Sequence, residues 1–521
     1  MLAATAGLST ATAQETINLE PAWTRVSSPW ESGARQVTLG GDGSRVAVVQ
    51  SPFSSERREY STFQTSGAAQ QEVVLGESVQ RQELSSASDA ALGAWYRLVQ
   101  TGSGYQYQAR ISVYELGSES QSWEYVFPFD PGIADGGVKV SSDGTRVVAW
   151  VYNPHIFRTS LVLLDGASGQ VLSSHNVNTS GRPNVCDITA DGSLALLSTI
   201  ARAFVIDTAS GSVLYSKIFV MGHGGLALSP DGSTLALSDS TNGVWFLRRQ
   251  GGTYNQFASI PDLPDFICAR TAFSTDGSTV ALSWENSATR RALRLGILQV
   301  NATSLTTLHD ETFHSSADVQ LVMTSLRLNA TGDRLVMAHW GDGDTNVLPE
   351  LLVYGREDNG QAWTRTHERN LPGSVVSLDV STDGSVIVAS SSDSHVNLGG
   401  AGARLNCFDL TPRRFEFEGN ARIGETITFR VRGRSLDHGH LLTSATKAPT
   451  PLEFPGIGTL YLKRSALSFS SRQQGGTDGW IEFQHTIPND PALVGTKLYA
   501  QGLTLSTRSL TDDFIELTIA D

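Results

Sequence analysis

The sequence predicts an all-β protein in which a β-propeller, with eight blades favoured and seven also open, is followed by a small β-sandwich domain. Three observations predict this fold: a repeated hairpin-like segment, the spacing of its copies, and a change of composition after Thr411. The chain has 521 residues, of which 40% are hydrophobic, so it is long enough to bury the cores of two domains.

The repeated segment is a strand-like run that ends at a tight polar turn and is followed by a second strand-like run. Most copies carry Asp-Gly at the turn, as in LALSPDGSTLALS. Asp-Gly between alternating apolar residues is a strong hairpin signal, because the turn needs a positive φ that glycine adopts at no steric cost. The second and seventh copies lack this pair, which keeps a seven-bladed ring open. The copies start at Val37, Leu84, Val138, Cys186, Leu226, Thr271, Leu326 and Leu378.

The spacing of the copies is that of propeller blades. The shortest step between equivalent turn positions runs from Asp191 to Asp231 and the longest from Asp276 to Thr331, close to the roughly 40 to 50 residues of a four-stranded blade. Two hairpins per period, with no helical periodicity between them, favour a propeller over a sandwich or a βαβ fold. Third and fourth strands can be read from Ser160, Ala203, Gly243 and Leu351.

The fifth copy resembles a known repeat family. GHGGLALSPDGSTLALSDSTNGVWFLRR, from Gly222 to Arg249, is similar to a WD40 repeat in its Gly-His opening, its SPDG turn and its hydrophobic third strand. No copy carries the closing Trp-Asp, and only this one carries Gly-His. The resemblance implies a WD40-like or YVTN-like propeller over about residues 20 to 410. It implies no particular chemistry, because this architecture hosts scaffolds, ligand binders and hydrolases.

The last repeat lacks a fourth strand before the chain leaves for the next domain. The segment PAWTRVSS, Pro21 to Ser28, precedes the first inner strand as fourth strands precede the later ones. We therefore expect this segment to pair with the last blade and to close the ring.

The chain divides into three predicted regions. Residues 1–13 end in Ala11-Thr12-Ala13, which fits the cleavage site of a signal peptide, although no basic residue precedes Arg25. They are expected to be a truncated signal peptide or, alternatively, a flexible tail. Residues 14–411 are the propeller, and an extracellular, periplasmic or cell-envelope location is expected.

Residues 412–521 form the third region and read as about eight short strands, which is the pattern of a small β-sandwich. Within it, Ile487 to Leu505 resembles a C-terminal module that recurs in predicted secreted bacterial proteins, often behind propellers. The resemblance implies no activity.

Charge and cysteine content exclude several classes of function. Basic and acidic residues number 12 each from Pro412 onward, so the propeller carries the whole net charge of −14. An acidic propeller repels polyphosphates, which argues against nucleic acid and anionic membranes as partners. No apolar stretch is long enough for membrane insertion. The three cysteines, Cys186, Cys268 and Cys407, are expected to be buried thiols.

Two faces of the propeller are expected to differ. Connections from second to third strands, and from fourth strands to the next blade, share one face, called the loop face below; the Asp-Gly turns occupy the opposite turn face. Aromatic and charged residues concentrate in the longer loops, where binding normally resides, although about half of these rings should pack against their own blades. The predicted binding residues for a protein or glycan partner are Tyr105, Tyr107, Tyr152, His155, Arg158, Trp284 and Trp340.

Residues that enter the inner strands from the loop face should surround the channel mouth. Such a mixed-charge funnel suits a small polar ligand, but the same residues could form structural salt bridges. The predicted channel-mouth residues are Arg35, Asp135, Arg182, His223, Asp265 and His314, with Asn184 and Arg270 beside them.

One segment has the alternating oxygen ligands of a calcium loop: Asp342, Asp344 and Asn346, with Glu350 further on. Val347 and Val353 stand where an EF-hand has Gly and Glu, so a surface turn rich in Asp is the competing interpretation. No other cofactor is indicated.

Motifs for nucleophilic catalysis are not evident, since the sequence has no Gly-x-Ser-x-Gly, HExxH or phosphate loop. The sequence therefore favours an exported, monomeric, non-enzymatic binding or structural protein. A lactonase-type or other metal-dependent hydrolase, with its site at the channel mouth, is the alternative. A periplasmic scaffold with the same fold is a third hypothesis.

Overall fold

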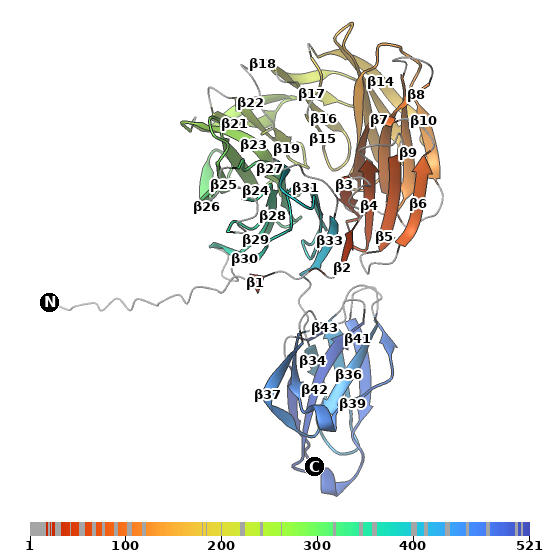
Figure 1. Cartoon of the computed structure of the whole chain (residues 1–521), viewed down its shortest axis with the longest axis vertical. Helices are drawn as coiled ribbons and strands as arrows, with labels where there is room; N and C mark the ends of the chain where they lie inside the picture. Colours follow the sequence, from red (N-terminus) through yellow and green to blue (C-terminus); the bar gives the residue numbers. More distant parts are fainter. Residues whose placement is uncertain are drawn as a thin grey trace, which may run out of the picture. The chain divides into compact units, whose positions relative to one another are not determined.

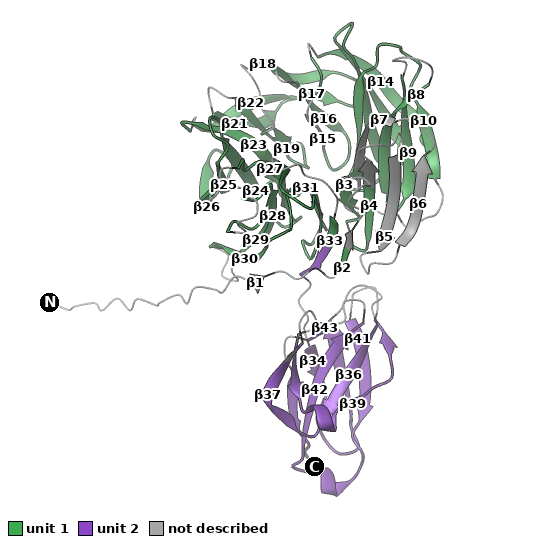
Figure 2. Cartoon of the chain, viewed as in Figure 1, with its two compact units in different colours: residues 1–19, 24–64, 69–406 green, residues 20–23, 65–68, 407–521 purple. Residues whose placement is uncertain are grey.

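The computed structural model of the chain describes residues 17–18, 21, 23–26, 33–41, 43–51, 58–64, 69–75, 79–87, 92–101, 107–116, 121–179, 181–183, 185–199, 201–218, 225–239, 243–261, 263–315, 319–342, 347–356, 362–396, 404–410, 415–432, 438–454, 458–475, 480–505, 509–511 and 514–521. It falls into two compact units, coloured separately in Figure 2. Unit 1 comprises residues 1–19, 24–64 and 69–406, and unit 2 comprises residues 20–23, 65–68 and 407–521.

The first half of unit 1 consists of four antiparallel sheets of four strands, numbered here as blades 1 to 4. Blade 1 contains β3 (Gly33–Leu39), β4 (Arg45–Ser51), β5 (Arg58–Gln64) and β6 (Ala69–Leu75). Blade 2 contains β7 (Val79–Ser86), β8 (Leu92–Gln100), β9 (Tyr107–Glu115) and β10 (Gln121–Val126). Blade 3 contains β11 (Asp135–Val140), β12 (Arg146–Asn153), β13 (Arg158–Asp165) and β14 (Val171–Asn178). Blade 4 contains β15 (Val185–Ile188), β16 (Leu194–Ser198), β17 (Arg202–Asp207) and β18 (Val213–Ile218).

The remaining sheets of this series are blades 5 to 8. Blade 5 contains β19 (Ala227–Leu228), β20 (Thr234–Asp239), β21 (Gly243–Gln250) and β22 (Thr253–Ile260). Blade 6 contains β23 (Phe266–Phe273), β24 (Thr279–Asn286), β25 (Ala292–Val300) and β26 (Leu305–His314). Blade 7 contains β27 (Met323–Leu328), β28 (Arg334–His339), β29 (Leu351–Arg356) and β30 (Trp363–Arg369), with β1 (Ile17–Asn18) added parallel to β30. Blade 8 contains β31 (Val375–Val380), β32 (Val386–Ser391), β33 (Arg404–Asp409) and β2 (Trp23–Val26).

The prediction of an all-β propeller is confirmed by this topology. In Figure 1, the innermost strands β3, β15, β19, β23, β27 and β31 face one another around the middle of unit 1. The apolar cores lie between neighbouring blades: one core joins blades 2 and 3, and the next joins blades 3 and 4. Three more cores continue this pattern from blade 4 to blade 7. Blades 3 to 6 therefore each bury both of their faces against their neighbours.

The ring closes between blades 8 and 1. The Thr382 amide donates to the Gly41 carbonyl at 2.9 Å, and the Leu39 amide donates to Asp379 Oδ2 at 2.8 Å. The segment predicted to supply the missing fourth strand does so as β2, which lies next to β33 in blade 8. The Thr24 hydroxyl donates to Asn406 Oδ1 at 2.9 Å across this pair. The predicted closing strand is confirmed.

The Asp-Gly turns owe their shape to a repeated set of hydrogen bonds. In blade 5, the Ser229 hydroxyl donates to Asp231 Oδ1 at 2.6 Å, and the same carboxylate oxygen accepts from the Ser233 amide at 3.0 Å. Gly232 has φ +70°, a conformation in which a side chain would be strained. The Asp therefore accepts local donors while the Gly supplies the left-handed residue, as the sequence pattern predicts.

Unit 2 is also all-β. A three-stranded sheet contains β34 (Phe415–Glu418), β35 (Thr426–Arg432) and β41 (Trp480–Thr486). A six-stranded sheet contains β36 (His438–Ser444), β39 (Ser468–Phe469), β40 (Gln473–Gln474), β42 (Lys497–Thr504), β43 (Ser509–Leu510) and β44 (Ile515–Thr518). β37 (Lys447–Phe454) and β38 (Gly458–Leu462) form a two-stranded sheet. One apolar core joins the first two sheets through Phe429, Leu441 and Ile481.

The described part of unit 2 contains the 3₁₀ turns Arg464–Ala466 and Pro491–Leu493. None of the helices among the described residues has the length and apolar character required to cross a bilayer.

Candidate functional site

The turn face is a hydrogen-bonded ring of short turns. Amide groups just before the turn glycines donate to the equivalent carbonyls of the next blade. These bonds run from Ser142 to Ala190 (2.8 Å), Ala190 to Pro230 (2.6 Å), Thr275 to Ala330 (3.1 Å), Ala330 to Thr382 (2.8 Å) and Thr382 to Gly41 (2.9 Å). Since each turn satisfies its own polar groups and those of a neighbour, this face serves the stability of the ring.

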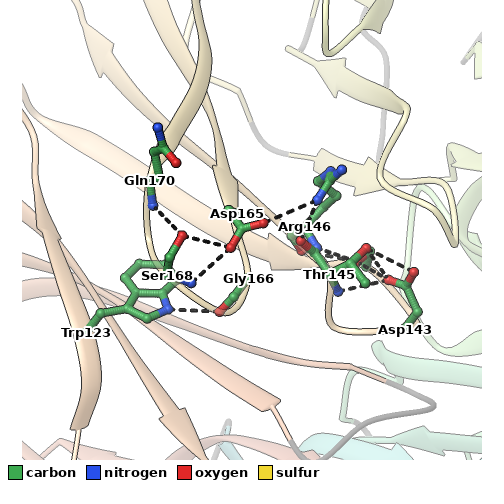
Figure 3. A network of polar contacts seen from close by, with 9 residues as sticks. Trp123, Asp143, Thr145, Arg146, Asp165, Gly166, Ser168 and Gln170 are labelled. Carbon is green, nitrogen blue, oxygen red and sulfur yellow. Dashed lines mark hydrogen bonds and ion pairs between the residues drawn. The ribbon is translucent and has the colours of Figure 1, made fainter.

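The outer hairpins on the same face lock against neighbouring blades. In Figure 3, the Trp123 indole of blade 2 donates from Nε1 to the Gly166 carbonyl of blade 3 at 2.8 Å. Asp165 holds this hairpin by accepting from the Ser168 hydroxyl at 2.8 Å, and it forms an ion pair with Arg146 at 3.6 Å. The Trp123 hydrogen bond thus joins blade 2 to blade 3, while the contacts of Asp165 order the hairpin within blade 3.

The loop face has a different backbone character. Among the described residues, the non-glycine residues with positive φ are Phe157 (+49°), Asp265 (+65°) and Arg290 (+54°), and all three lie on this face. The carbonyl of each accepts from an amide of the adjoining connection: Thr179 at 3.2 Å, Ser287 at 2.7 Å and Leu321 at 2.6 Å, respectively. Positive φ costs free energy for a residue other than glycine. Residues in this conformation are often found at functional sites.

An exposed apolar patch lies on the loop face of blade 3. It consists of Phe129, Ile156 and Phe157, which are 53%, 49% and 57% exposed. Phe129 belongs to the connection that enters blade 3, and the other two belong to the turn between β12 and β13. Large apolar side chains that gather on a surface indicate an interaction site more strongly than scattered ones do.

A polar frame connects the two segments of this patch. Asn153 Nδ2 donates to both carboxylate oxygens of Asp130 at 2.9 Å, and Asp130 also accepts from the Gly132 amide at 2.9 Å. Arg158 Nη2 lies 3.9 Å from Asp130 Oδ2. Asp130 adjoins Phe129 in the chain and Arg158 adjoins Phe157, so the frame places the two rings on neighbouring stretches of backbone.

A buried cluster of ionisable side chains supports the loop face of blade 7. His339, Asp342 and Glu350 are at most 1% exposed. His339 Nδ1 accepts from the Gly341 amide at 2.9 Å, and Glu350 Oε2 accepts from the Leu371 amide at 2.6 Å. Burial lowers the pKa of His339 to about 4 and raises that of Glu350 to about 8. These side chains are buried and accept hydrogen bonds from backbone amides, so they order the loops around blade 7.

The predicted binding residues fall into two groups. His155 is exposed and Arg158 is partly exposed beside the apolar patch. By contrast, Tyr152 and Trp284 are buried in the cores between blades, and Tyr107 packs against the core of blades 2 and 3. These three rings correct the prediction of surface anchors, because residues near the loop ends of the middle strands still face the neighbouring blade.

Trp340 is partly buried between two loops. Its ring lies edge-on to His395, with centroids 6.0 Å apart, and its carbonyl accepts from the Ser374 hydroxyl at 3.0 Å. It therefore joins the loops of blades 7 and 8. Tyr105 lies outside the described residues.

The predicted channel-mouth residues are likewise dispersed. Asp135 begins the inner strand β11, is 3% exposed, and forms an ion pair with Arg182, which is the structural salt bridge considered as the alternative. Asp265 is exposed in the turn before β23. His314 ends the outer strand β26 opposite Ala292, which corrects its predicted place beside an inner strand. Arg35 lies on β3, but its side chain is not among those that the structure describes. His223 and Asn184 lie outside the described residues.

Of the three predicted calcium ligands, the structure describes one, Asp342. Asp342 is buried, and its Oδ2 accepts from the Leu348 amide at 3.2 Å; Asp344 and Asn346 lie outside the described residues. Among the residues that the structure describes, no group of three or more His, Cys, Asp or Glu side chains could hold a metal ion. Cys268 and Cys407 are buried free thiols, as expected.

Sequence reasoning missed Phe129 and Ile156 as surface residues. Their only sequence signal is an apolar side chain in a segment whose neighbours, such as Pro131 and Pro154, mark it as a loop. It also missed that Arg270 of blade 6 donates from Nε to the Thr324 carbonyl on β27, the strand of blade 7 that carries Arg327.

Comparisons with known proteins give information on the fold alone. No protein-family model matches the sequence, and no curated protein matches it. Among solved structures, the chain is similar to the C-terminal WD40 domain of Sif2, with 12% identity and a TM-score of 0.50 over 75% of this chain and 99% of that one. The Dos1 propeller follows at 13% identity and a TM-score of 0.45, covering 74% and 95% of the two chains. A chain of the mitotic checkpoint complex has 13% identity and a TM-score of 0.42, covering 77% and 99%. The first likeness and the topology together assign this chain a β-propeller fold.

Proposed function

We propose that the propeller is a non-enzymatic binding module that engages a protein partner through its loop face. The observation that carries this proposal is the exposed patch of Phe129, Ile156 and Phe157 on a hydrogen-bonded frame. Phe and Ile offer no hydrogen-bonding group. The patch therefore suits an apolar side chain of a protein better than a hydroxyl-rich glycan.

The energetics of the patch support this role. Fully burying a Phe or Ile side chain contributes roughly 1.5 to 3 kcal/mol, and each of these side chains is about half exposed, so each could contribute about 1 kcal/mol on binding. The frame around Asp130 and Asn153 already orders the backbone, which lowers the entropic cost of association. The phenylalanines are accordingly the expected anchors.

The opposite face offers no comparable surface in its described turns. Its turn residues are small and polar, and their donors are used within the turn or by the next blade, as for Ser229 and Asp231. We infer that the turn face stabilises the ring and that the loop face binds the partner.

A site-specific crosslinking experiment tests this function. A photo-crosslinking amino acid at Ile156 should capture a defined protein from an envelope extract of the native host, whereas the same group at the exposed turn-face residue Thr275 should not. Phe129→Ser should abolish that capture without changing the melting temperature. Equal capture from both faces, or capture that survives Phe129→Ser, would argue against the proposal.

Two further assays address the alternatives. Binding of a glycan array by the loop face, lost in Phe129→Ser, would replace the protein partner with a glycan. Turnover of a panel of esters and lactones would favour the hydrolase with its site at the channel mouth.

We further propose that the protein acts outside the cytoplasm, in the periplasm, the cell envelope or the medium, with unit 2 as a spacer or attachment module. The residues Ala11-Thr12-Ala13 support this location, because they fit a signal-peptidase site. Fractionation of the native host, with mass spectrometry of the protein's N-terminus, tests the proposal. Recovery from the cytoplasm alone would contradict it.

A further inference from the structure

We propose that the inner wall of the propeller binds a tetrahedral oxyanion, such as phosphate or sulfate, between Arg270 of blade 6 and Arg327 of blade 7. Both residues lie on innermost strands, Arg270 on β23 and Arg327 on β27. Both remain open to solvent, and the Arg327 side chain is 51% exposed.

The two guanidinium groups are positioned along one strand. Arg270 Nε donates to the Thr324 carbonyl at 3.3 Å, and Arg327 Nη1 donates to the Leu326 carbonyl at 3.2 Å. These carbonyls are two residues apart on β27. A strand rises about 3.3 Å per residue, so the two guanidinium groups are anchored about 7 Å apart along the same wall.

Each guanidinium group keeps a donor for a ligand. Arg270 also donates from Nη1 to the Ala269 carbonyl at 2.9 Å, and Arg327 Nε lies 3.4 Å from Asp379 Oδ1. Nη2 of Arg270 and Nη2 of Arg327 have no hydrogen-bond acceptor within the described part of the chain. A tetrahedral oxyanion between them could accept from both.

The carboxylates nearby are engaged by other donors. Asp379 Oδ2 accepts from the Thr38 hydroxyl at 3.0 Å and from the Leu39 amide at 2.8 Å. Glu285 Oε1 accepts from the Met323 amide at 2.8 Å. Burial raises the pKa of Glu285, which favours its neutral form.

Two more charged inner-strand residues stand at positions equivalent to Arg327. Lys139 is on β11 and Asp187 is on β15. Asp187 accepts from the Ile188 amide at 3.0 Å, and burial raises the pKa of Asp187 as well. The wall around the two arginines therefore carries side chains of both charge signs, in a chain whose net charge is −14.

The chemistry of the two arginines selects the ligand. A guanidinium group presents donors in a planar fork that matches the oxygens of phosphate and sulfate. Arg270 lies within electrostatic reach of Glu285, which attracts its guanidinium, and of Arg327, which repels it less strongly. A doubly charged oxyanion between the two arginines relieves this repulsion.

Isothermal titration of the full-length protein with inorganic phosphate and with sulfate, at constant ionic strength in chloride, tests the site. Both anions should bind, and Arg270→Gln or Arg327→Gln should each weaken binding at least tenfold. Arg294→Gln is the matched control, because that guanidinium is already paired with Asp310 on the outer strands. The control should bind as the unaltered protein does.

A second measurement guards against misfolding of the variants. Modification of the unaltered protein by phenylglyoxal, mapped by mass spectrometry, should be slowed by phosphate at Arg270 and Arg327 but not at Arg294. Absence of binding up to about 10 mM phosphate, equal affinity in the glutamine variants, or no protection of the two arginines would overturn the proposal.

Discussion

The side-chain amide of Asn329 donates to Asp333 Oδ1 at 2.6 Å in the turn of blade 7. In the same turn, Asn329 Oδ1 accepts from the Arg334 amide at 2.9 Å. In other blades, a Ser hydroxyl at the position of Asn329 donates to an Asp two residues later. In blade 8, the Ser381 hydroxyl donates to Asp383 Oδ1 at 2.6 Å. Blade 7 thus reaches the same turn with its carboxylate two positions later, which is why its sequence does not show the Asp-Gly pair.

Loss of this substitute network should destabilise the ring. Asn329→Ala removes the acceptor of the partly buried Arg334 amide, and an unsatisfied donor away from solvent costs about 1 to 3 kcal/mol. We expect a fall of about that size in the free energy of unfolding in urea. Thr275→Ala changes an exposed residue of the same face and should stay within about 0.5 kcal/mol; similar effects of both changes would contradict this account.

The close approach of Gly169 to Trp123 should also be visible in stability. Gly169 has φ +71°, and a Cβ there would lie 2.6 Å from the Trp123 ring. Gly169→Ala should therefore cost clearly more than Gly251→Ala, where φ is +57° and no atom lies within 4 Å of the added Cβ. Backbone strain alone costs about 1 kcal/mol. Equal losses in chemical denaturation would show that the Trp123 contact contributes nothing.

The buried Glu350 should make stability depend on pH. Its pKa is raised by burial from 4.5 to about 8, so the folded protein binds this proton more tightly than the unfolded chain does. The stability associated with neutral Glu350 is fully present below about pH 4.5 and is lost as the pH rises to about 8. At about 1.4 kcal/mol for each unit of pKa, the loss should be on the order of 5 kcal/mol.

Glu350→Gln isolates this effect. The amide oxygen of Gln can still accept from the Leu371 amide, but the side chain does not ionise. Urea unfolding at pH 5 and pH 9 should show a smaller decrease for the variant than for the unaltered protein. Parallel pH profiles would mean that Glu350 does not govern this dependence.

The left-handed Phe157 allows recognition to be separated from folding. Phe157→Asn removes the exposed ring, and Asn tolerates positive φ better than Phe does. We expect an unchanged or slightly higher melting temperature, together with at least a tenfold loss of capture by the crosslinker at Ile156. A large fall in melting temperature would instead assign this ring a structural role.

The architecture could be predicted from the sequence because it depends on short-range chemistry. Each Asp-Gly turn is closed by residues within five positions of one another, as in the contact of Ser229 with Asp231 and with the Thr234 amide. The closing strand was predictable by counting strands, since blade 8 lacked one before Pro21 to Ser28 was considered.

The candidate site could not be predicted in the same way. Tyr152 and Phe157 are aromatic residues five positions apart, yet the first is buried between blades and the second is 57% exposed. Which ring reaches solvent depends on the neighbouring blade, and a local sequence pattern contains no information on that neighbour. The sequence by itself thus determined the hairpins, the repeat and the closure of the ring, because those follow from local hydrogen bonding and periodicity. Only the tertiary structure decided the exposed patch and the anchoring of Arg270 on the strand that carries Arg327, because both depend on contacts between segments that are distant in the chain.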